Sequence, residues 1–311
     1  MAEKINITFL GTGSAIPTAR RNHPAILLQY KEQNMLFDCG EGTQRQFRKA
    51  KLNPCKITKI FISHWHGDHT LGLPGILQTL ALNGYNGILE IHGPHNTKKN
   101  IQAILDFNMR NYLRNSKTEG YNFQIKAFDH ITGTIIDTDE YEILCTKLDH
   151  EAPALAYSFK IKEKNRLNKE KLKKLKIPNG PLIKELTLGK TITINGKKID
   201  GKKILYTEPS RKITIINDTR YIKELESFSK DSDLLICEST YSKEEQEIAK
   251  KHGHMTSYDA AKIAKKSKSK ELCLFHLSQR YDQIPKIIQK EAKEIFKEKI
   301  TIPDDLDKVV L

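Results

Sequence analysis

Long apolar runs are missing from this chain of 311 residues. Nowhere do about 18 apolar residues follow one another, which is the length that a membrane-spanning helix requires. The first residues, MAEKINITFLGTG, also lack the basic segment leading into an uninterrupted apolar stretch that is typical of a signal peptide. These absences exclude an integral membrane protein, and they predict a soluble chain without a cleaved leader.

Cysteine is also scarce, and no two cysteines form a C-x-x-C pair. An odd number of widely separated cysteines argues against a disulfide framework and against a cysteine zinc knuckle. We therefore expect reduced thiols in the core of a cytoplasmic protein. The five cysteines are Cys39, Cys55, Cys145, Cys237 and Cys273.

Acidic residues are too few to balance the basic ones. There are 38 Asp and Glu against 52 Lys and Arg, which gives a net charge of +14 and a pI near 9.3. Such a balance favours polyanionic partners, either nucleic acid or an anionic membrane surface.

Most of the excess charge lies in one segment, residues 160–203. It contains fifteen Lys or Arg and four acids, a net +11, and few apolar residues from which to build a core. Within it, NKEKLKKLK predicts a short basic helix capped by Asn168. A solvated loop is the ordinary interpretation of a charge run. The concentration of charge favours instead an arm that projects from a core of residues 1–159 and 204–311 and contacts nucleic acid.

Short β-prone runs separated by glycine and proline turns recur along the chain. Helical spacings lie between them, for example over residues 98–114, where Ile101, Ile104, Leu105 and Met109 share one face. Because strands and helices interleave throughout, the fold class is α/β (α+β) with a layered sandwich. The predicted strands are residues 5–10, 25–30, 35–38, 59–63, 141–150, 155–162, 203–207, 212–218, 233–240 and 270–277.

The stretch FISHWHGDHTLGLPG, residues 61–75, carries the strongest chemical signal. His64 and His66, two residues apart after a strand, can turn their imidazoles to the same side. We expect Gly67 to allow a tight turn that brings Asp68 and His69 to a second point. The spacing suits two adjacent metal ions, and ligands without thiolate favour zinc, with manganese or iron also compatible.

Four clustered ligands cannot fill two metal shells, so further ligands must come from elsewhere in the fold. Three later strands end in a suitable residue, namely His150 in CTKLDH, Asp218 in ITIIND and His276 in LCLFH. Each of these, taken singly, also fits a surface histidine or a capping aspartate. Beside the first cluster, they become the expected partners.

These motifs resemble the metallo-β-lactamase superfamily and, within it, the ribonuclease Z family of endonucleases, which remove the 3′ trailer from precursor transfer RNA (tRNA). The resemblance runs from FLGTGSAIPT through LFDCGEGTQRQ, HWHGDHTLGLPG, DHEAPALAY, NDTR and HMTS to HLSQRY. It implies a four-layer αβ/βα sandwich holding two Zn²⁺ per subunit, with Mn²⁺ or another divalent metal as a substitute. It places His64, His66 and His150 on the first zinc, Asp68, His69 and His276 on the second, and Asp218 as a bridge between them.

The resemblance also implies the chemistry. A metal-activated hydroxide would attack the phosphodiester near the discriminator base and leave a 3′-hydroxyl on the tRNA. Asp68 would orient the attacking water or accept its proton. His254, held by Glu238 and followed two residues later by Thr256, would protonate the leaving oxygen, because a neighbouring carboxylate raises the pKa of an imidazole.

Two positions depart from the family wording. The family has His-Glu-Ala-Thr at the glutamate and Gly-Asp-Thr-Arg at the bridge, whereas Cys237 and Asn217 stand at the first positions here. Both departures spare the functional carboxylate, so activity should persist. From the residues alone, Asp38 at a strand end is a candidate acceptor for a ligand imidazole, although a turn aspartate fits the same pattern.

RNA contacts are implied on the arm and beside the site. Members of the family carry a lysine-rich insertion with a Gly-Pro turn that grips the tRNA elbow, and often form homodimers in which one subunit's arm serves the other's site. Because lysines on phosphates read no sequence, recognition would follow RNA shape. Ala19 replaces the lysine of the family's element for sensing the CCA end, which puts that function in doubt. The implied contact residues are Gly180, Pro181, Lys171, Lys173 and Lys174 on the arm, Ser278 and Arg280 for the scissile phosphate, Thr256 after the acid, and Arg21 and Asn22 at the CCA end.

Three alternatives remain. Another hydrolase of the superfamily, acting on a small phosphodiester, sulfate ester or lactone, would not need the basic arm. A non-catalytic RNA-binding protein would gain nothing from a complete ligand set. A broader nuclease acting on other RNAs or on single-stranded DNA also fits the sequence.

Overall fold

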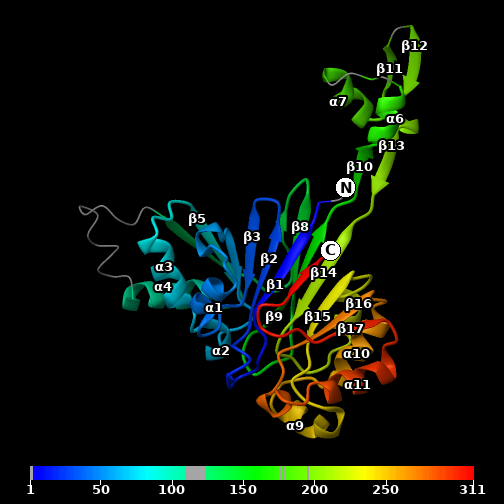
Figure 1. The fold of residues 1–311 in the computed structure, drawn as a ribbon. Helices are drawn as coiled ribbons and strands as arrows, with labels where there is room; N and C mark the ends of the chain where they lie inside the picture. The colour runs from blue at the N-terminus through cyan, green and yellow to red at the C-terminus, as the bar shows by residue number, and fades with distance from the viewer. Residues whose placement is uncertain (1–2, 109–122, 176, 178–179, 195) are drawn as a thin grey trace, which may run out of the picture.

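The computed structural model describes residues 3–108, 123–175, 177, 180–194 and 196–311. Two seven-stranded sheets lie face to face, and helices cover their outer faces (Figure 1). The layered α/β sandwich expected from the sequence is confirmed. Among the described residues, no helix is long and apolar enough to cross a membrane.

The first sheet has the order β18-β1-β2-β3-β4-β5-β6. Its first strands form antiparallel hairpins, and β3 to β6 then run parallel. The helices α1 (Thr43–Lys49), α3 (Leu73–Leu82) and α4 (Thr97–Asn108) lie on its outer face. The strands are β1 (Ile5–Gly11), β2 (Ala25–Tyr30), β3 (Gln33–Phe37), β4 (Lys59–Phe61), β5 (Ile88–Gly93), β6 (Gln124–Asp129) and β18 (Lys308–Val310).

The second sheet has the order β17-β16-β15-β14-β9-β8-β7. The helices α8 (Glu224–Phe228), α10 (Ser257–Lys266) and α11 (Lys286–Ile295) cover its outer face, and α9 (Gln246–Lys251) lies near one end. The strands are β7 (Gly133–Asp137), β8 (Tyr141–Lys147), β9 (Leu155–Ile161), β14 (Arg211–Ile216), β15 (Leu234–Glu238), β16 (Glu271–Phe275) and β17 (Lys299–Thr301).

The main core lies between the sheets. Phe9 of β1 and Phe275 of β16 are both fully buried, with ring centroids 6.0 Å apart. Rings also stack across neighbouring parallel strands, with centroids 4.9 Å apart for Phe37 and Phe61 and 5.1 Å apart for Phe61 and His92. Burying one such apolar ring stabilises the fold by about 1.5–3 kcal/mol. The two sheets are therefore held in one fixed arrangement, and their edges meet in a defined way.

The helix expected over residues 98–114 is α4, which the structure describes as Thr97–Asn108. Ile101 is buried on the core side, and Ile104 and Leu105 pack against the same apolar cluster. Met109 and the rest of the expected helix lie outside the described residues.

The basic segment projects from the sandwich as an arm (Figure 1). The arm begins with β10 (Lys164–Leu167) and ends with β13 (Leu205–Glu208), because these two strands pair with each other. Its limits therefore differ from the expected 160–203: Lys160 and Ile161 belong to β9 in the second sheet, and residues 204–208 belong to the arm. Between them lie α6 (Lys169–Lys174), α7 (Pro181–Thr187), β11 (Thr191–Ile194) and β12 (Lys197–Asp200).

The arm has a small core of its own. Leu186, Ile192 and Ile204 are buried, and partly buried residues such as Leu167 and Leu172 pack against them. The sequence shows few apolar residues here, but the hairpins bring scattered Leu and Ile to one side. This core keeps the arm folded while its lysines face outward.

Candidate metal centre

Strand ends from both sheets meet at one edge of the sandwich, where they place three histidines together. His64 and His66 follow β4, and His150 follows β8. His66 Nδ1 lies 3.0 Å from His64 Nε2 and 3.3 Å from His150 Nε2. Three imidazole nitrogens converging at such distances form one candidate metal position.

A second group of ligand atoms lies beside the first. His69 Nε2 is 3.3 Å from Asp68 Oδ2, and His276 Nε2 is 3.6 Å from the same oxygen. Asp218, which follows β14, places Oδ1 3.2 Å from His276 Nε2 and Oδ2 3.4 Å from His69 Nε2. These two histidines and two carboxylates form a second candidate position.

Asp218 connects the two positions. Its Oδ2 lies 3.6 Å from His64 Nε2 of the first group while it also faces His69 of the second. The side chain is almost fully buried. One carboxylate therefore faces both groups, as a bridging ligand must.

The residues fit a pair of divalent cations. His69 Nε2, His276 Nε2 and Asp218 Oδ1 are buried and have no hydrogen-bond partner among the described residues. A buried polar atom without a partner costs about 1–3 kcal/mol, so three that converge on one point call for a ligand. Imidazole nitrogen and carboxylate oxygen are donors that suit zinc, and also manganese or iron.

An unusual backbone conformation orients the side chains of Asp38 and His276 toward the site. Asp38 at the end of β3 and His276 at the end of β16 adopt left-handed conformations, with φ of 56° and 57°. Such conformations cost about 1 kcal/mol or more for residues other than glycine and occur often at functional sites. Gly67 does not make the tight turn that we expected, because it begins the short helix α2 (Gly67–Thr70) with His66 as the N-cap.

Asp38 and Ser63 orient the ligand imidazoles. Asp38 Oδ2 lies 2.7 Å from His69 Nδ1, and Asp38 also accepts hydrogen bonds from the backbone and hydroxyl of Ser63 at 2.7 and 2.8 Å. Ser63 Oγ is in turn 3.0 Å from His64 Nδ1. With their Nδ1 atoms engaged, both imidazoles present Nε2 to the site. Asp38 is the acceptor that the sequence suggested, whereas Ser63 carries no signal in the sequence.

Two further residues that sequence reasoning missed support His150 and His276. The carbonyl oxygen of Gly253 lies 2.9 Å from His150 Nδ1, and a Cβ at position 253 would lie only 2.6 Å from that nitrogen. Thr240 Oγ1 lies 3.0 Å from His276 Nδ1 and 2.7 Å from Glu238 Oε2. The glycine between His252 and His254 and the Thr240 of CEST are the only hints of these contacts in the sequence.

His254 and Glu238 form a pair beside the metal positions. His254 Nδ1 lies 3.2 Å from Glu238 Oε1, and Glu238 is fully buried. Burial alone would lower the pKa of His254, but the Glu238 and Asp218 carboxylates raise that pKa to about 9. The geometry thus favours a protonated imidazole that can donate a proton.

This pair is not a third metal position, although Glu238, His254 and His276 lie within ligand distance of one another. Glu238 Oε1 already accepts the backbone N–H of Thr219 at 2.8 Å, and Oε2 faces Thr240. His276 presents Nε2 to the second group instead.

Electrostatics gives Asp218, His64 and His150 the charge states that a cation requires, whereas the neighbouring carboxylates of Asp218, Asp38 and Asp68 raise the pKa of His69 despite its burial. Burial acts to raise the pKa of Asp218, but His276 and His69 hold it well below its ordinary value, so the carboxylate is charged. Burial lowers the pKa of His64 and of His150, which keeps both imidazoles neutral, as metal ligands must be.

A cavity of about 290 Å³ lies over both metal positions. Ser278 and Arg280, expected to contact the scissile phosphate, line this cavity with Asp68 and His254. Its other wall residues are Ser14, Ala15, Ile16, His66, His150, Glu151, Asp218, Thr240, Tyr241, His252 and Gln279.

Three residues expected to touch RNA make contacts within the protein. Arg21 is 2% exposed, and its guanidinium binds Thr12, the Pro303 carbonyl and Asp304. The Asn22 side-chain amide donates to the Glu41 carbonyl at 2.8 Å. Thr256 is fully buried and caps α10 by bonding to Asp259.

The arm residues expected to contact RNA are well separated from the cavity, because the arm leaves the sandwich at the opposite ends of β9 and β14 (Figure 1). Lys171, Lys173 and Lys174 are exposed on α6, and Gly180 and Pro181 are exposed at the start of α7.

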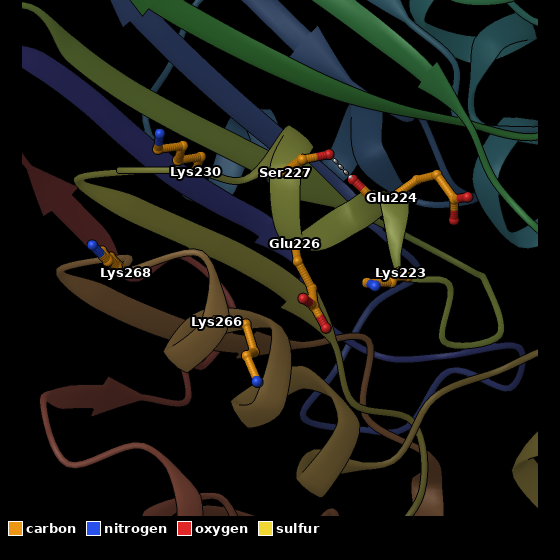
Figure 2. A pocket seen from close by; sticks show the side chains of 7 residues that line it. All are labelled: Lys223, Glu224, Glu226, Ser227, Lys230, Lys266 and Lys268. Carbon is orange, nitrogen blue, oxygen red and sulfur yellow. Dashed lines mark hydrogen bonds between the residues drawn. The ribbon is translucent and has the colours of Figure 1, made fainter.

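A larger surface groove of about 470 Å³ lies between α8 and the end of α10 (Figure 2). Its walls carry Lys223, Lys230, Lys266 and Lys268 with Glu224 and Glu226, but no histidine. Its two carboxylates do not belong to any of the converging groups of ligand atoms found among the described residues.

Comparisons with known proteins agree with this geometry. The model of the family described as Anti-Pycsar protein Apyc1 matches residues 5–171. The ribonuclease Z of Methanococcus maripaludis strain C5 is 38% identical over 308 residues, which cover 96% of this chain and 93% of that protein. The structure of human tRNase Z, short form, has a TM-score of 0.68 and 26% identity and covers 98% of both chains. YhfI of Bacillus subtilis, titled a metallo-beta-lactamase fold protein, has a TM-score of 0.71 and 18% identity over 100% of both chains, which shows the fold alone.

Proposed function

The chain belongs to the ribonuclease Z family and, through residues 5–171, to the family of the Apyc1 model, and from that membership we propose that it is a zinc-dependent endoribonuclease that removes the 3′ trailer from precursor tRNA. The observation that carries the proposal is that one cavity is lined by residues of both metal-ligand groups and by His254, which the buried Glu238 holds in place. Hydrolysis of a phosphodiester needs both an activated water and a donor for the leaving oxygen, and this cavity offers residues for each.

Two zinc ions per subunit would be held by the two groups described above. His64, His66 and His150 would hold the first, Asp68, His69 and His276 the second, and Asp218 would touch both. When bound, such a pair supplies Lewis acidity that lowers the pKa of water and offsets charge on the phosphate.

Asp68 is positioned to accept the proton of the attacking water. It lies at the wall of the cavity, with 12% of its side chain exposed, while the imidazoles of His69 and His276 hold its pKa well below the ordinary value against the effect of burial. A charged carboxylate open to the cavity can orient water by accepting its hydrogen bond, and it would take the proton once a bound metal pair had lowered the pKa of that water.

His254 is positioned to donate a proton to the leaving 3′-oxygen. Glu238 fixes the ring through Nδ1, so the other ring nitrogen, Nε2, is left to act as the donor. Protonation of the leaving oxygen gives a 3′-hydroxyl on the tRNA and leaves the phosphate on the trailer. Arg280 and Ser278 would hold the phosphate from the cavity wall.

The arm would bind the tRNA body. Lys171, Lys173 and Lys174 offer charge to phosphates, and Gly180 and Pro181 lie on the same arm. We also propose a cytoplasmic homodimer in which the arm of one subunit serves the cavity of the other. The support is that β14 separates the arm from its own cavity by six residues, about 20 Å, and the arm points away.

A broader phosphodiesterase is the second candidate, because two metal positions beside a proton donor suit other phosphodiesters as well, and residues 5–171 also match the Apyc1 model. That match ends before Asp218, Glu238 and His254, whereas the similarity to ribonuclease Z extends over nearly the whole chain. The arm also gives a reason for a large RNA substrate, which a small ester does not.

The test is cleavage of an end-labelled precursor tRNA by the full chain, with zinc or manganese and with a chelator. We expect a metal-dependent cut beside the discriminator base that Asp68→Ala abolishes without loss of folding. Asp137→Ala, which removes an exposed carboxylate from β7, is the matched control and should cut normally. RNA that is bound but stays whole with either metal would refute the catalytic assignment.

A further inference from the structure

One aromatic side chain in the cavity has no part in the chemistry above. Tyr241 directly follows Thr240 and lines the cavity with His254 and Arg280. The centroid of its ring lies 5.9 Å from that of His254, with the ring planes inclined at 57°. A flat surface beside the proton donor lies within reach of groups attached to the leaving ribose.

Tyr241 is held in place by its neighbours. Its carbonyl accepts a hydrogen bond from Ser257 N at 3.0 Å. The guanidinium of Arg280 lies over the ring, with Cζ 5.5 Å from the centroid, and a 2.8 Å ion pair ties Arg280 to Glu245. The ring is therefore pre-organised, so little side-chain freedom is lost when a planar ligand binds it.

The cavity wall also offers apolar surface. Ile16, which lines the same cavity, is 56% exposed, and Tyr241 is half-buried. An exposed isoleucine and an aromatic ring give nothing to a phosphate but do suit the face of a nucleobase. The polar groups around them account for the phosphate and ribose.

We propose that Tyr241, with Arg280 packed on it, is a stacking subsite for the base of the nucleotide whose 3′-oxygen is released. The proposal rests on the function proposed above, because His254 delivers its proton to that oxygen. The ribose that carries the oxygen then lies beside His254, and its base comes within reach of the neighbouring Tyr241 ring. Since every base has a π-face, this subsite accepts all four bases, with tighter binding of the larger purines.

The experiment combines a substitution at Tyr241 with removal of the base from the RNA, so that the effect of each can be measured with and without the other. Wild type, Tyr241→Leu and Tyr241→Phe are assayed on a precursor tRNA carrying adenine, or no base, at the nucleotide before the cut. Base–aromatic stacking corresponds to roughly a 10- to 100-fold effect on kcat/KM. Tyr258→Leu, which removes an exposed tyrosine from α10, is the matched control.

For wild type, we expect kcat/KM to be lower by that factor on the abasic RNA than on the intact RNA, mainly because KM rises. For Tyr241→Leu, kcat/KM should already be reduced by this factor on the intact RNA and should fall little further on the abasic RNA. For Tyr241→Phe, kcat/KM should still depend on the base. Tyr241→Met removes the aromatic plane in a different shape and serves if the leucine variant misfolds.

Two results would overturn the subsite while the proposed function stands. Wild type could cut both RNAs equally well, or Tyr241→Leu could retain the full sensitivity to removal of the base. Failure of wild type to cut any precursor tRNA would instead remove the proposed function and the subsite with it.

Discussion

The arm lysines allow a prediction whose size follows from counterion release. Lys171, Lys173 and Lys174 are exposed on α6, and among the described residues none of them pairs with a carboxylate, although Lys171 Nζ donates to the Lys203 carbonyl at 2.7 Å. Replacing all three with glutamine removes three charges without altering the small arm core. The prediction concerns how strongly precursor tRNA binds, and how that binding depends on salt.

Each phosphate contact contributes a slope of about 0.7–0.9 to the dependence of log affinity on log salt. Losing three contacts should therefore flatten the slope by roughly 2 to 2.7, which corresponds to about a 100- to 500-fold rise in KM near 0.1 M salt. The value of kcat should hold, because the arm leaves the sandwich about 20 Å from the cavity.

The assay is steady-state cleavage of precursor tRNA over a range of salt concentrations. The matched control replaces Lys223, Lys266 and Lys268 of the surface groove in Figure 2 with glutamine. It removes the same three charges from a surface outside the arm. Equal slopes for the two variants would refute a specific arm contact and leave only overall charge as the cause. A fall in kcat for the arm variant would refute the separation of binding from chemistry.

Three further predictions concern the site and the core. Glu238→Gln removes the charge beside His254 and should lower kcat by roughly 100-fold or more at nearly unchanged KM; an unchanged kcat would refute the need for a carboxylate beside His254. Gly253→Ala places a Cβ 2.6 Å from His150 Nδ1 at a φ of 72°, so the content of bound divalent metal, measured by elemental analysis, should fall together with the thermal midpoint, and an unchanged metal content would contradict the contact. Burial lowers the pKa of His92 to about 4, so its stabilising effect is complete above the unfolded pKa near 6.5 and is lost as pH falls toward 4. When the pH is lowered from 7 to 5, the free energy of unfolding measured by urea titration should fall by about 2 kcal/mol more for wild type than for His92→Phe, which keeps the ring stack. Equal falls would refute the low pKa of His92.

The main features of the site could be predicted because the ligands follow strands. His64, His150, Asp218 and His276 each stand just after an apolar run, and parallel strand ends meet at one edge of a sheet. The local pattern therefore carries information about a three-dimensional arrangement.

The supporting contacts could not be predicted, because they depend on packing between distant segments. Ser63, Thr240 and Gly253 are ordinary residue types whose roles arise only when strand ends and loops from separate parts of the chain lie side by side. Arg21 illustrates the converse: its position in PTARRN suggests an RNA contact, but the loop packs on residues 303–305, more than 280 residues later in the chain. The limits of the arm were missed because the pairing of β10 with β13 joins segments about 40 residues apart.

The division of the metal ligands between the two sheets has a consequence for the newly made chain. His69 leaves the ribosome about 200 residues before His276, which at 5–20 residues per second is a delay of roughly 10–40 s. During that time the nascent protein holds only part of the ligand set. A chain without His276 has an incomplete second ligand group, so we expect metal-dependent cleavage to begin only when synthesis is almost complete.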